Sequence, residues 1–299
     1  MTDEKLNNGS AVALGNFDGM HIGHSLVLDR TLEMSDAGFI PTVMLFDEHS
    51  LKSVTGEAPP RLMTDSERLV FLKEKGLKIK TVNFADIRNL SPEEFVDGIL
   101  LKNFNARAVV CGYNYRFGRN AVGNAELLRD LCETRGIKCI TVDEVMLDGN
   151  PVSSTEIRKA VENGDIVLAN RMLGRHFGFT AQVIRGDARG RTWGFPTINQ
   201  RLPDGLVIPR FGVYQSVVRF DSREYTGVTN IGSRPTVGTH IVLSETNILD
   251  FDGDLYGKDV EVRLIRFIRP EHKFGSFDEL VKQIKNDVSA VKGGETENV

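Results

Sequence analysis

Apolar and polar positions follow two different patterns along the chain. In the first half, short apolar runs alternate with stretches whose apolar residues recur every three or four positions, the period of a helix. The runs predict strands at residues 11–14, 42–46, 79–84, 108–111 and 139–142, and the periodic stretches predict helices at residues 25–34, 65–75, 92–101 and 125–135. Strands that alternate with helices predict a mostly parallel sheet covered on both faces.

Capping residues mark several of the expected helix ends. Ser91 followed by Pro92 and two glutamates is typical of a helix start, because a serine cap, a proline at the first position and acidic residues in the first turn are all favourable there. Two further helices are expected, one opened by Ser153 or Ser154 and one opened by Asp165 and ended by Gly174.

The pattern changes after residue 176. From residue 177 to about residue 269, short strands such as residues 212–218 and 260–264 alternate with turns rich in Gly, Asp and Pro, which is typical of an antiparallel barrel or sandwich. Residues 277–291 predict one amphipathic closing helix, and residues 292–299 form a polar tail. We therefore expect two domains, residues 1–174 and residues 175–299, and a length of 299 residues also favours two.

Composition narrows the classes of protein. The formal net charge of −4 disfavours a general polyanion binder, although local arginines and helix ends could still bind a small anion. The cysteines show no CxxC spacing, and we expect Cys132 and Cys139 to be reduced core thiols, as in a reducing compartment. The first residues are polar and no apolar run reaches 18 residues, so a cytoplasmic protein with no membrane segment is expected.

A glycine- and histidine-rich string follows the first expected strand, GNFDGMHIGH at residues 15–24. Its glycines permit a tight turn with backbone N–H groups close to a ligand, and His21 and His24 can face the same way where the next helix begins. The string predicts a cradle for nucleotide phosphates. The alternative is that one histidine caps the helix while the other is merely exposed; a metal site is disfavoured because no third ligand is suitably spaced.

Two later segments also suggest anion or metal binding. In residues 152–158, VSSTEIR, hydroxyls and N–H groups at a helix start with Arg158 one turn in could bind an anion, and the alternative is a capping box of Ser153 and Glu156. In residues 186–199, Arg189 and Arg191 lie in a glycine-rich stretch that ends in GFPTIN. Thr197 and Asn199 would offer hard oxygens from one face of a strand, and the alternative for the glycine-rich part is an ordinary hairpin turn.

Together these motifs resemble those of the bifunctional riboflavin kinase/FAD synthetases. The resemblance covers roughly residues 11–287 and rests on ordered motifs at residues 15–24, residues 110–118 (VCGYNYRFG), residues 152–158, residues 186–199, residues 230–236 (NIGSRPT), residues 245–257 (ETNILDFDGDLYG) and residues 269–274 (RPEHKF). It implies an N-terminal Rossmann-like nucleotidylyltransferase domain of α/β class, followed by a C-terminal antiparallel β-barrel riboflavin kinase domain with a closing helix. It also implies that the chain phosphorylates riboflavin to FMN with ATP and adenylylates FMN to FAD, with release of pyrophosphate.

The resemblance also implies roles for individual residues. In the first domain, it assigns the triphosphate to His21, His24, Ser154 and Arg158, further ATP contacts to Gly15, Phe17, Gly23, Ser153 and Thr155, and flavin contact to Asn114. In the second domain, it assigns ATP to Gly186, Arg189, Arg191 and Gly194, Mg²⁺ to Thr197 and Asn199, the catalytic base to Glu245, and flavin contact to Arg269. For Glu245 the alternative is an exposed strand residue. Asp250, Asp252 and Asp254 alternate like a calcium loop, but Gly253 breaks that pattern and predicts a turn.

One departure from the family bears on function. The family usually has Pro-His-Pro after its second strand, whereas this chain reads Phe46-Asp47-Glu48-His49-Ser50. A kinase with weak or lost FAD synthetase activity is therefore an alternative, and a regulatory flavin- or RNA-binding protein is another. The retained Glu245, Thr197 and Asn199 and both histidines favour an enzyme, and the acidic balance disfavours nucleic acid. The expected partners are riboflavin, FMN, FAD and ATP with Mg²⁺, with no membrane, and the sequence leaves the oligomeric state open.

Overall fold

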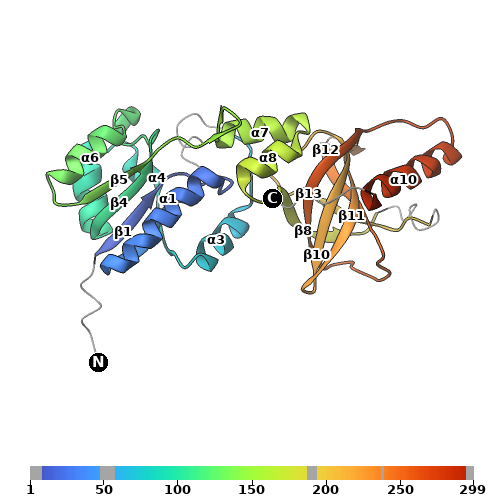
Figure 1. Ribbon diagram of the computed structural model, residues 1–299, viewed down its shortest axis with the longest axis horizontal. Coiled ribbons are helices and arrows are strands. Elements are labelled where there is room, and N and C mark those ends of the chain that lie inside the picture. The colour runs from blue at the N-terminus through green and yellow to red at the C-terminus, as the bar shows by residue number, and fades with distance from the viewer. Residues whose placement is uncertain (1–8, 48–57, 187–193, 237–238, 294–299) are drawn as a thin grey trace, which may run out of the picture. The chain divides into compact units, whose positions relative to one another are not determined.

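The computed structural model describes residues 9–47, 58–186, 194–236 and 239–293. The chain forms two compact units (Figure 1). The first consists of residues 1–59 and 65–153, and the second consists of residues 60–64 and 154–299. No helix among the described residues is long and apolar enough to span a membrane.

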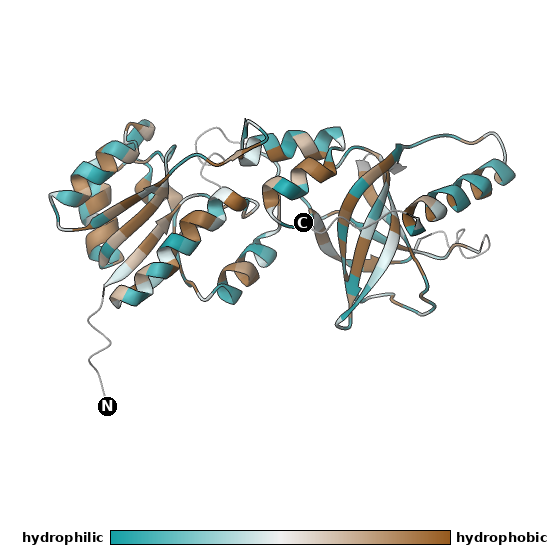
Figure 2. Cartoon of the chain, in the orientation of Figure 1, coloured by the Kyte–Doolittle hydropathy of each residue, from teal (hydrophilic) through white to brown (hydrophobic). Residues whose placement is uncertain are grey.

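The first unit is built on a parallel sheet in the order β3-β2-β1-β4-β5. Its strands are β1 (Ser10–Leu14), β2 (Ile40–Phe46), β3 (Lys78–Val82), β4 (Ala106–Gly112) and β5 (Lys138–Val142). The central strand β1 is buried along its whole length, as its continuous apolar run predicts for a sheet covered on both faces. Figure 2 shows these strands as mostly hydrophobic, whereas the helices around them carry both kinds of residue. The prediction of a mostly parallel sheet is confirmed.

Helices connect these strands. They are α1 (Ile22–Glu33), η2 (Met34–Ala37), α3 (Asp65–Glu74), α4 (Phe84–Ile87), α5 (Pro92–Glu94), η3 (Phe95–Asn103), η4 (Arg119–Ala121) and α6 (Ala125–Glu133), and a small hairpin of β6 (Met146–Leu147) and β7 (Asn150–Pro151) follows. The strand expected at residues 79–84 ends earlier. Asn83 caps α4 through a 2.8 Å bond from the Ala85 N–H, and the Asp47 carboxylate accepts the Phe84 N–H, so the chain turns into a helix there.

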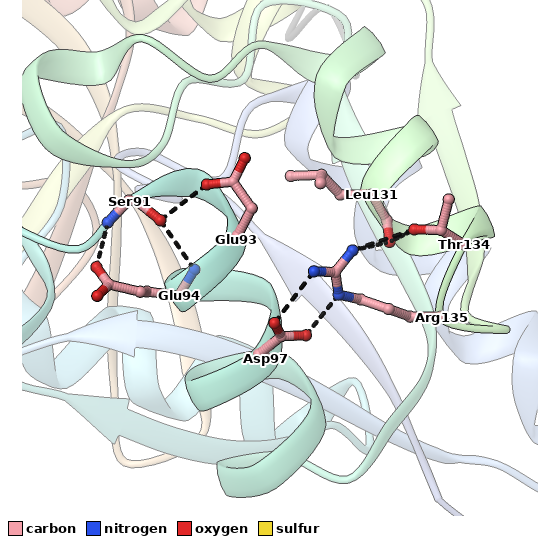
Figure 3. Close-up of polar contacts among 7 residues, drawn as sticks. All are labelled: Ser91, Glu93, Glu94, Asp97, Leu131, Thr134 and Arg135. Atoms are coloured by element: carbon pink, nitrogen blue, oxygen red, sulfur yellow. Dashed lines mark hydrogen bonds and ion pairs between the residues drawn. The ribbon is translucent and has the colours of Figure 1, made fainter.

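The helix expected at residues 92–101 begins as predicted but changes type. The Ser91 hydroxyl accepts the Glu94 N–H at 3.1 Å while the Glu94 carboxylate accepts the Ser91 N–H at 2.7 Å, which makes a complete capping box (Figure 3). From Phe95 onward the helix has π-type hydrogen bonds. Asp97 in this π-helix binds the Arg135 guanidinium, which also donates to the Leu131 carbonyl in α6, so Arg135 fastens the two helices together (Figure 3).

The second unit is a closed antiparallel barrel in the order β10-β11-β12-β9-β8-β13. Its strands are β8 (Gly178–Ile184), β9 (Thr197–Arg201), β10 (Gly212–Phe220), β11 (Arg223–Thr236), β12 (Thr239–Ile248) and β13 (Asp259–Pro270), and its helices are α7 (Ser154–Asn163), α8 (Ile166–Leu173) and α10 (Phe277–Lys292). Of the two architectures compatible with the strand pattern, the barrel is therefore correct, and α10 matches the expected closing helix.

Buried hydroxyls identify the inner face of the barrel. Ser216 and Thr229 lie 2.7 Å apart, Thr229 and Thr246 lie 2.9 Å apart, and all three are fully buried. Because successive side chains of a strand point to opposite faces, Glu245 of β12 projects from the outer face. The outer surface of β9, β11 and β12 is thus where polar groups can meet a ligand.

Helix α8 is fastened to the barrel by one buried amide, that of Asn170. Its Nδ2 donates to the Leu264 carbonyl at 2.9 Å, and its Oδ1 accepts the Phe177 N–H at 2.7 Å. The compact units accordingly divide between Ser153 and Ser154, and they group α7 and α8 with the barrel. The domain boundary expected at residue 174 rests on the change of sequence pattern. It stays a prediction of where the second independent domain begins.

Candidate functional sites

The loop after β1 is a tight turn with an unusual backbone. Phe17 and Met20 have φ of 51° and 43°, and Gly19 has φ of 78°, in the left-handed region. The Phe17 side chain is fully buried, and its ring lies so close to Gly15 that a β-carbon there would sit 3.2 Å from the ring. Gly15 and Phe17 therefore shape this loop together, whatever else they contact.

Both histidines lie at the N-terminus of α1, and they contact each other. His21 caps the helix, since its Nδ1 accepts the His24 N–H at 3.2 Å. The two rings stack with centroids 3.6 Å apart, and the His24 ring also meets the edge of Phe17 at 5.3 Å. A β-carbon on Gly23 would approach the His21 ring to 3.2 Å, so a glycine there leaves room for the pair.

The sequence left open the alternative that one histidine caps the helix while the other is merely exposed, and the geometry agrees with only the first part of it. One histidine does cap the helix, but the other is half-buried in a ring stack rather than merely exposed. A neutral His21 that accepts a hydrogen bond at Nδ1 carries its proton on Nε2, so that nitrogen is a donor. A donor imidazole beside the positive end of a 12-residue helix suits an anionic ligand.

The loop that contains Asn114 follows the neighbouring strand. Leu14 of β1 pairs with Cys111 of β4, so Gly15 and Gly112 leave the sheet side by side at its carboxyl edge. The strand order reverses between these two strands, which is where open α/β sheets bind their ligands. The Asn114 side chain is exposed and lies 3.4 Å from an ideal β-carbon on Gly112. Within the first unit, the structure thus brings the histidine loop and the Asn114 loop to one edge.

Arg68 of α3 is a contributor that sequence reasoning missed. Its Nη1 donates to the Asn16 carbonyl at 3.2 Å, its Nη2 pairs with Asp65 at 2.9 Å, and 18% of its side chain is exposed. A cation is thereby held against the glycine-rich loop. Local sequence patterns do not indicate this contact, because 52 residues separate Arg68 from Asn16.

The SSTEIR segment spans the division between the units. Ser153 closes the first unit, and Ser154 is the first residue of α7 in the second. Thr155 is exposed in the first turn of α7, and Glu156 pairs with Lys159 at 2.8 Å. The Arg158 Nε donates to the Pro60 carbonyl at 2.6 Å, which ties the isolated segment of residues 60–64 to α7 within the second unit.

A row of polar residues crosses the outer face of the barrel. Glu245 of β12 lies directly between Asn199 of β9 and Asn230 of β11, since each pairs with it in register. Directly opposed residues on antiparallel strands have β-carbons roughly 4.5–5.5 Å apart. Glu245 is half-buried and Asn199 is 7% exposed, so this carboxylate lies between two amides rather than on an open strand surface. Asn230 was not singled out from the sequence.

Close contacts fix the residues that lie next to this polar row. A β-carbon on Gly186 would lie 2.6 Å from the Asn199 amide nitrogen, so a side chain there would displace that amide. Gly194 is exposed with φ of 79°, and Asn247 donates to the Pro196 carbonyl at 2.7 Å, which fastens the GFPT turn to β12. Arg189, Arg191 and His49 lie outside the described residues.

The donors of this row suit a hard cation. Thr197 and Asn199 project from the same outer face as Glu245, which gives hydroxyl, amide and carboxylate oxygens of the kind that Mg²⁺ binds. Among the described residues, no group of three or more His, Cys, Asp or Glu side chains could hold a metal ion by itself.

The Arg269 side chain forms an ion pair with Asp287. Its Nε and Nη2 contact the carboxylate of Asp287 in α10 at 3.0 and 2.8 Å, and its Nη1 donates to the Pro270 carbonyl. Further along the same segment, Glu271 lies over the outer face of β11, because a β-carbon on Gly232 would come 2.1 Å from its carboxylate. Asp287 was missed from the sequence, and Glu271 was named there only as part of the RPEHKF motif.

Comparisons with known proteins agree with both halves of this description. The model of the FAD synthetase family matches residues 3–156, and the model of the riboflavin kinase family matches residues 173–293. The bifunctional riboflavin kinase/FMN adenylyltransferase of Haemophilus influenzae is 35% identical over 95% of this chain and 94% of its own length. That of Bacillus subtilis is 32% identical over 93% of this chain and 90% of its own length. The chain belongs to this family.

A solved structure has the same arrangement of elements. A crystal structure from Streptococcus pneumoniae, titled as a macrolide-efflux protein, superposes with a TM-score of 0.89 at 30% identity and covers 97% of this chain and 95% of its own. The fold of riboflavin kinase/FMN adenylyltransferases that the motifs implied, an α/β unit followed by an antiparallel barrel and a closing helix, is thus confirmed.

Proposed function

We propose that the chain phosphorylates riboflavin to FMN in its barrel unit. The observation that carries this proposal is the row Asn199–Glu245–Asn230 on the outer face of the barrel. Transfer of the γ-phosphate to the ribityl hydroxyl requires removal of that hydroxyl's proton, and Glu245 is the carboxylate placed to accept it. Gly186 and Gly194 border the nucleotide, and Thr197 and Asn199 hold Mg²⁺, which when bound neutralises charge on the phosphates.

We further propose that the chain joins FMN to the adenylyl group of ATP and releases pyrophosphate. The FMN phosphate attacks the α-phosphate, so no side chain need act as a nucleophile and the protein's work is positioning and charge stabilisation. His21 and His24 at the start of α1 support this role, together with Ser153, Ser154, Thr155 and Arg158 as further phosphate contacts. Asn114 holds the flavin.

The experiment is an assay of the purified full chain with riboflavin, ATP and Mg²⁺, in which FMN and FAD are separated by chromatography. We expect both products, with FAD appearing after FMN. FMN without FAD would favour a kinase that has lost its second activity, an alternative motivated by the altered motif at residues 46–50. Binding of flavin without turnover would favour a regulatory protein. With reduced thiols and no spanning helix among its described residues, we propose that the enzyme acts in the cytoplasm.

A further inference from the structure

Three cysteines converge in the first unit, and neither proposed reaction uses them. Cys111 lies in β4, Cys132 near the end of α6, and Cys139 in the edge strand β5. Cys111 and Cys132 are fully buried in one apolar cluster, and the half-buried Cys139 packs against it. The Cys139 thiol interacts with both of the other thiols, and all three are free.

Strand register indicates which two sulfurs can be joined. Cys139 is opposite Val109, and Cys111 is opposite Thr141, so Cys111 and Cys139 are diagonal neighbours. Diagonal neighbours lie roughly 7–8 Å apart, whereas the two Cα atoms of a disulfide usually lie about 4.4–6.8 Å apart. Cys132 instead reaches the strand from the helix above it, and its carbonyl accepts the Ile137 N–H at 2.9 Å where the chain turns into β5. Cys132 is therefore the better partner for Cys139.

The surroundings also indicate which thiol reacts first. Hydrogen bonds from Cys111 and Cys132 lower the pKa of the Cys139 thiol, and the nearby positive charge of Arg129 acts in the same direction. The hydrogen bond with Cys139, together with burial, raises the pKa of Cys132. Cys132 also lies near the negative end of α6, which disfavours a thiolate there. Cys139 is the thiol with both solvent access and thiolate character, the two properties of a reactive cysteine.

We propose that Cys139 and Cys132 form a reversible redox pair that responds to peroxides. The Cys139 thiolate attacks one oxygen of hydrogen peroxide, the O–O bond breaks, and sulfenic acid forms at Cys139 with release of hydroxide. The Cys132 sulfur then attacks the Cys139 sulfur. An S–S bond forms, and the sulfenic oxygen leaves with the Cys132 proton as water, so two thiols give two electrons to one peroxide.

The resulting cross-link would attach to a strand whose other end contacts the Asn114 loop. It joins the end of α6 to β5, and the Val142 carbonyl that ends β5 holds the Tyr113 N–H at 2.8 Å. Oxidation therefore acts on the strand that supports this loop.

Peptide mapping tests the pairing directly, because trypsin separates the three cysteines. Cys111 falls on the peptide of residues 108–116, Cys132 on residues 130–135, and Cys139 on residues 139–158. The folded full chain is treated with hydrogen peroxide, alkylated with N-ethylmaleimide, digested, and analysed by mass spectrometry without reductant. We expect a linked pair of the peptides 130–135 and 139–158 that dithiothreitol separates.

Two matched variants distinguish the roles. Cys111→Ser should keep the link, whereas Cys132→Ser should leave a sulfenic acid that dimedone labels at Cys139. A link through the peptide 108–116, or dimedone label at Cys132 in a Cys139→Ser variant, would overturn the assignment. The chain unfolded in urea serves as the reference for the peroxide dose. If a dose that oxidises the unfolded chain leaves all three thiols of the folded chain free to be alkylated, the proposed redox pair does not form and the proposal is overturned.

Discussion

Arg269 of β13 and Asp287 of α10 form a two-point ion pair, with Asp287 only 3% exposed. Gln283 adds a 2.9 Å bond to the same carboxylate, so the carboxylate is held from two sides. Arg269 was expected from family resemblance to contact flavin. That contact stays a prediction, and the contacts within the chain add a structural task, which is to fix α10 and the start of the segment of residues 269–274.

Removal of the Asp287 charge should therefore destabilise the barrel. Asp287→Asn keeps the size of the side chain but leaves a partly buried guanidinium with a weaker partner, and we expect a loss of about 2–3 kcal/mol in the free energy of unfolding. Urea denaturation measures it, with the exposed Lys285→Gln on the same helix as the control. If both variants unfold like the wild type, the pair does not stabilise α10.

A second prediction concerns the outer face of the barrel. Glu245→Gln removes the proposed base while preserving the shape between Asn199 and Asn230, so FMN formation should fall roughly 100- to 10,000-fold. Conversion of supplied FMN to FAD should stay near the wild-type rate, because that chemistry is proposed for other residues. Glu224→Gln, an exposed residue of β11, serves as the matched control. Riboflavin phosphorylation by Glu245→Gln at close to the wild-type rate would show that another group accepts the proton.

The sequence predicted those features that short-range patterns encode. The parallel sheet, the capping box at Ser91, and the α8 boundaries at Asp165 and Gly174 all appear as expected, because period and cap chemistry are local. The π-helix could not be distinguished from an α-helix, since the spacing of Phe95, Val96, Ile99 and Leu100 fits both over so few residues. No pattern within a few residues separates them.

Contacts between residues far apart in the chain could not be predicted from the sequence for a related reason. Asp287, Glu271 and Arg68 lie far along the chain from the groups they contact, and each looks like an ordinary surface charge by itself. The packing of helices and loops decides these contacts, whereas strand register decides which residues flank Glu245. The candidate residues of the outer face were named from motifs, but the place of Glu245 between two amides was not.

A third prediction follows from His176, whose pKa is lowered, chiefly by burial and also by Arg219. The Asn170 amide donates to its Nδ1 at 3.2 Å, which favours the neutral ring. The unfolded chain binds this proton more readily, with a pKa near 6.5, so the contribution to stability is complete above about pH 6.5 and is lost as the pH falls toward the folded pKa. Unfolding free energy should thus decline as the pH falls below about 6.5. His176→Gln should flatten that decline, and an unchanged slope would rule His176 out as its source.

A fourth prediction concerns how the barrel unit can be isolated. A fragment that begins at Leu173 removes Asn170 and leaves the Leu264 carbonyl and the Phe177 N–H without their partner. We expect a fragment of residues 154–299 to be soluble, to make FMN, and to melt at a clearly higher temperature than one of residues 173–299. Asn170→Ala in the longer fragment separates the amide from the rest of α8, because it should reproduce part of that loss. Equal melting temperatures for both fragments would place the independent domain at the boundary predicted from sequence.

The last prediction concerns the stacked histidines at the start of α1. His21 has two separable tasks, since its Nδ1 caps the helix and its Nε2 is the proposed donor to the triphosphate. His21→Ala removes both and should cost about 1 kcal/mol in stability and on the order of 100-fold in the rate of FAD formation. His21→Asn restores a cap acceptor without the imidazole, so stability should recover while the rate stays low. His24→Ala keeps the cap but removes one ring of the stack, so it should lose rate with a smaller loss of stability than His21→Ala, and FMN formation should be unchanged in all three. Thermal melting and both product assays on the same samples separate these tasks. A His21→Asn enzyme that makes FAD at the wild-type rate would show that the imidazole only caps the helix.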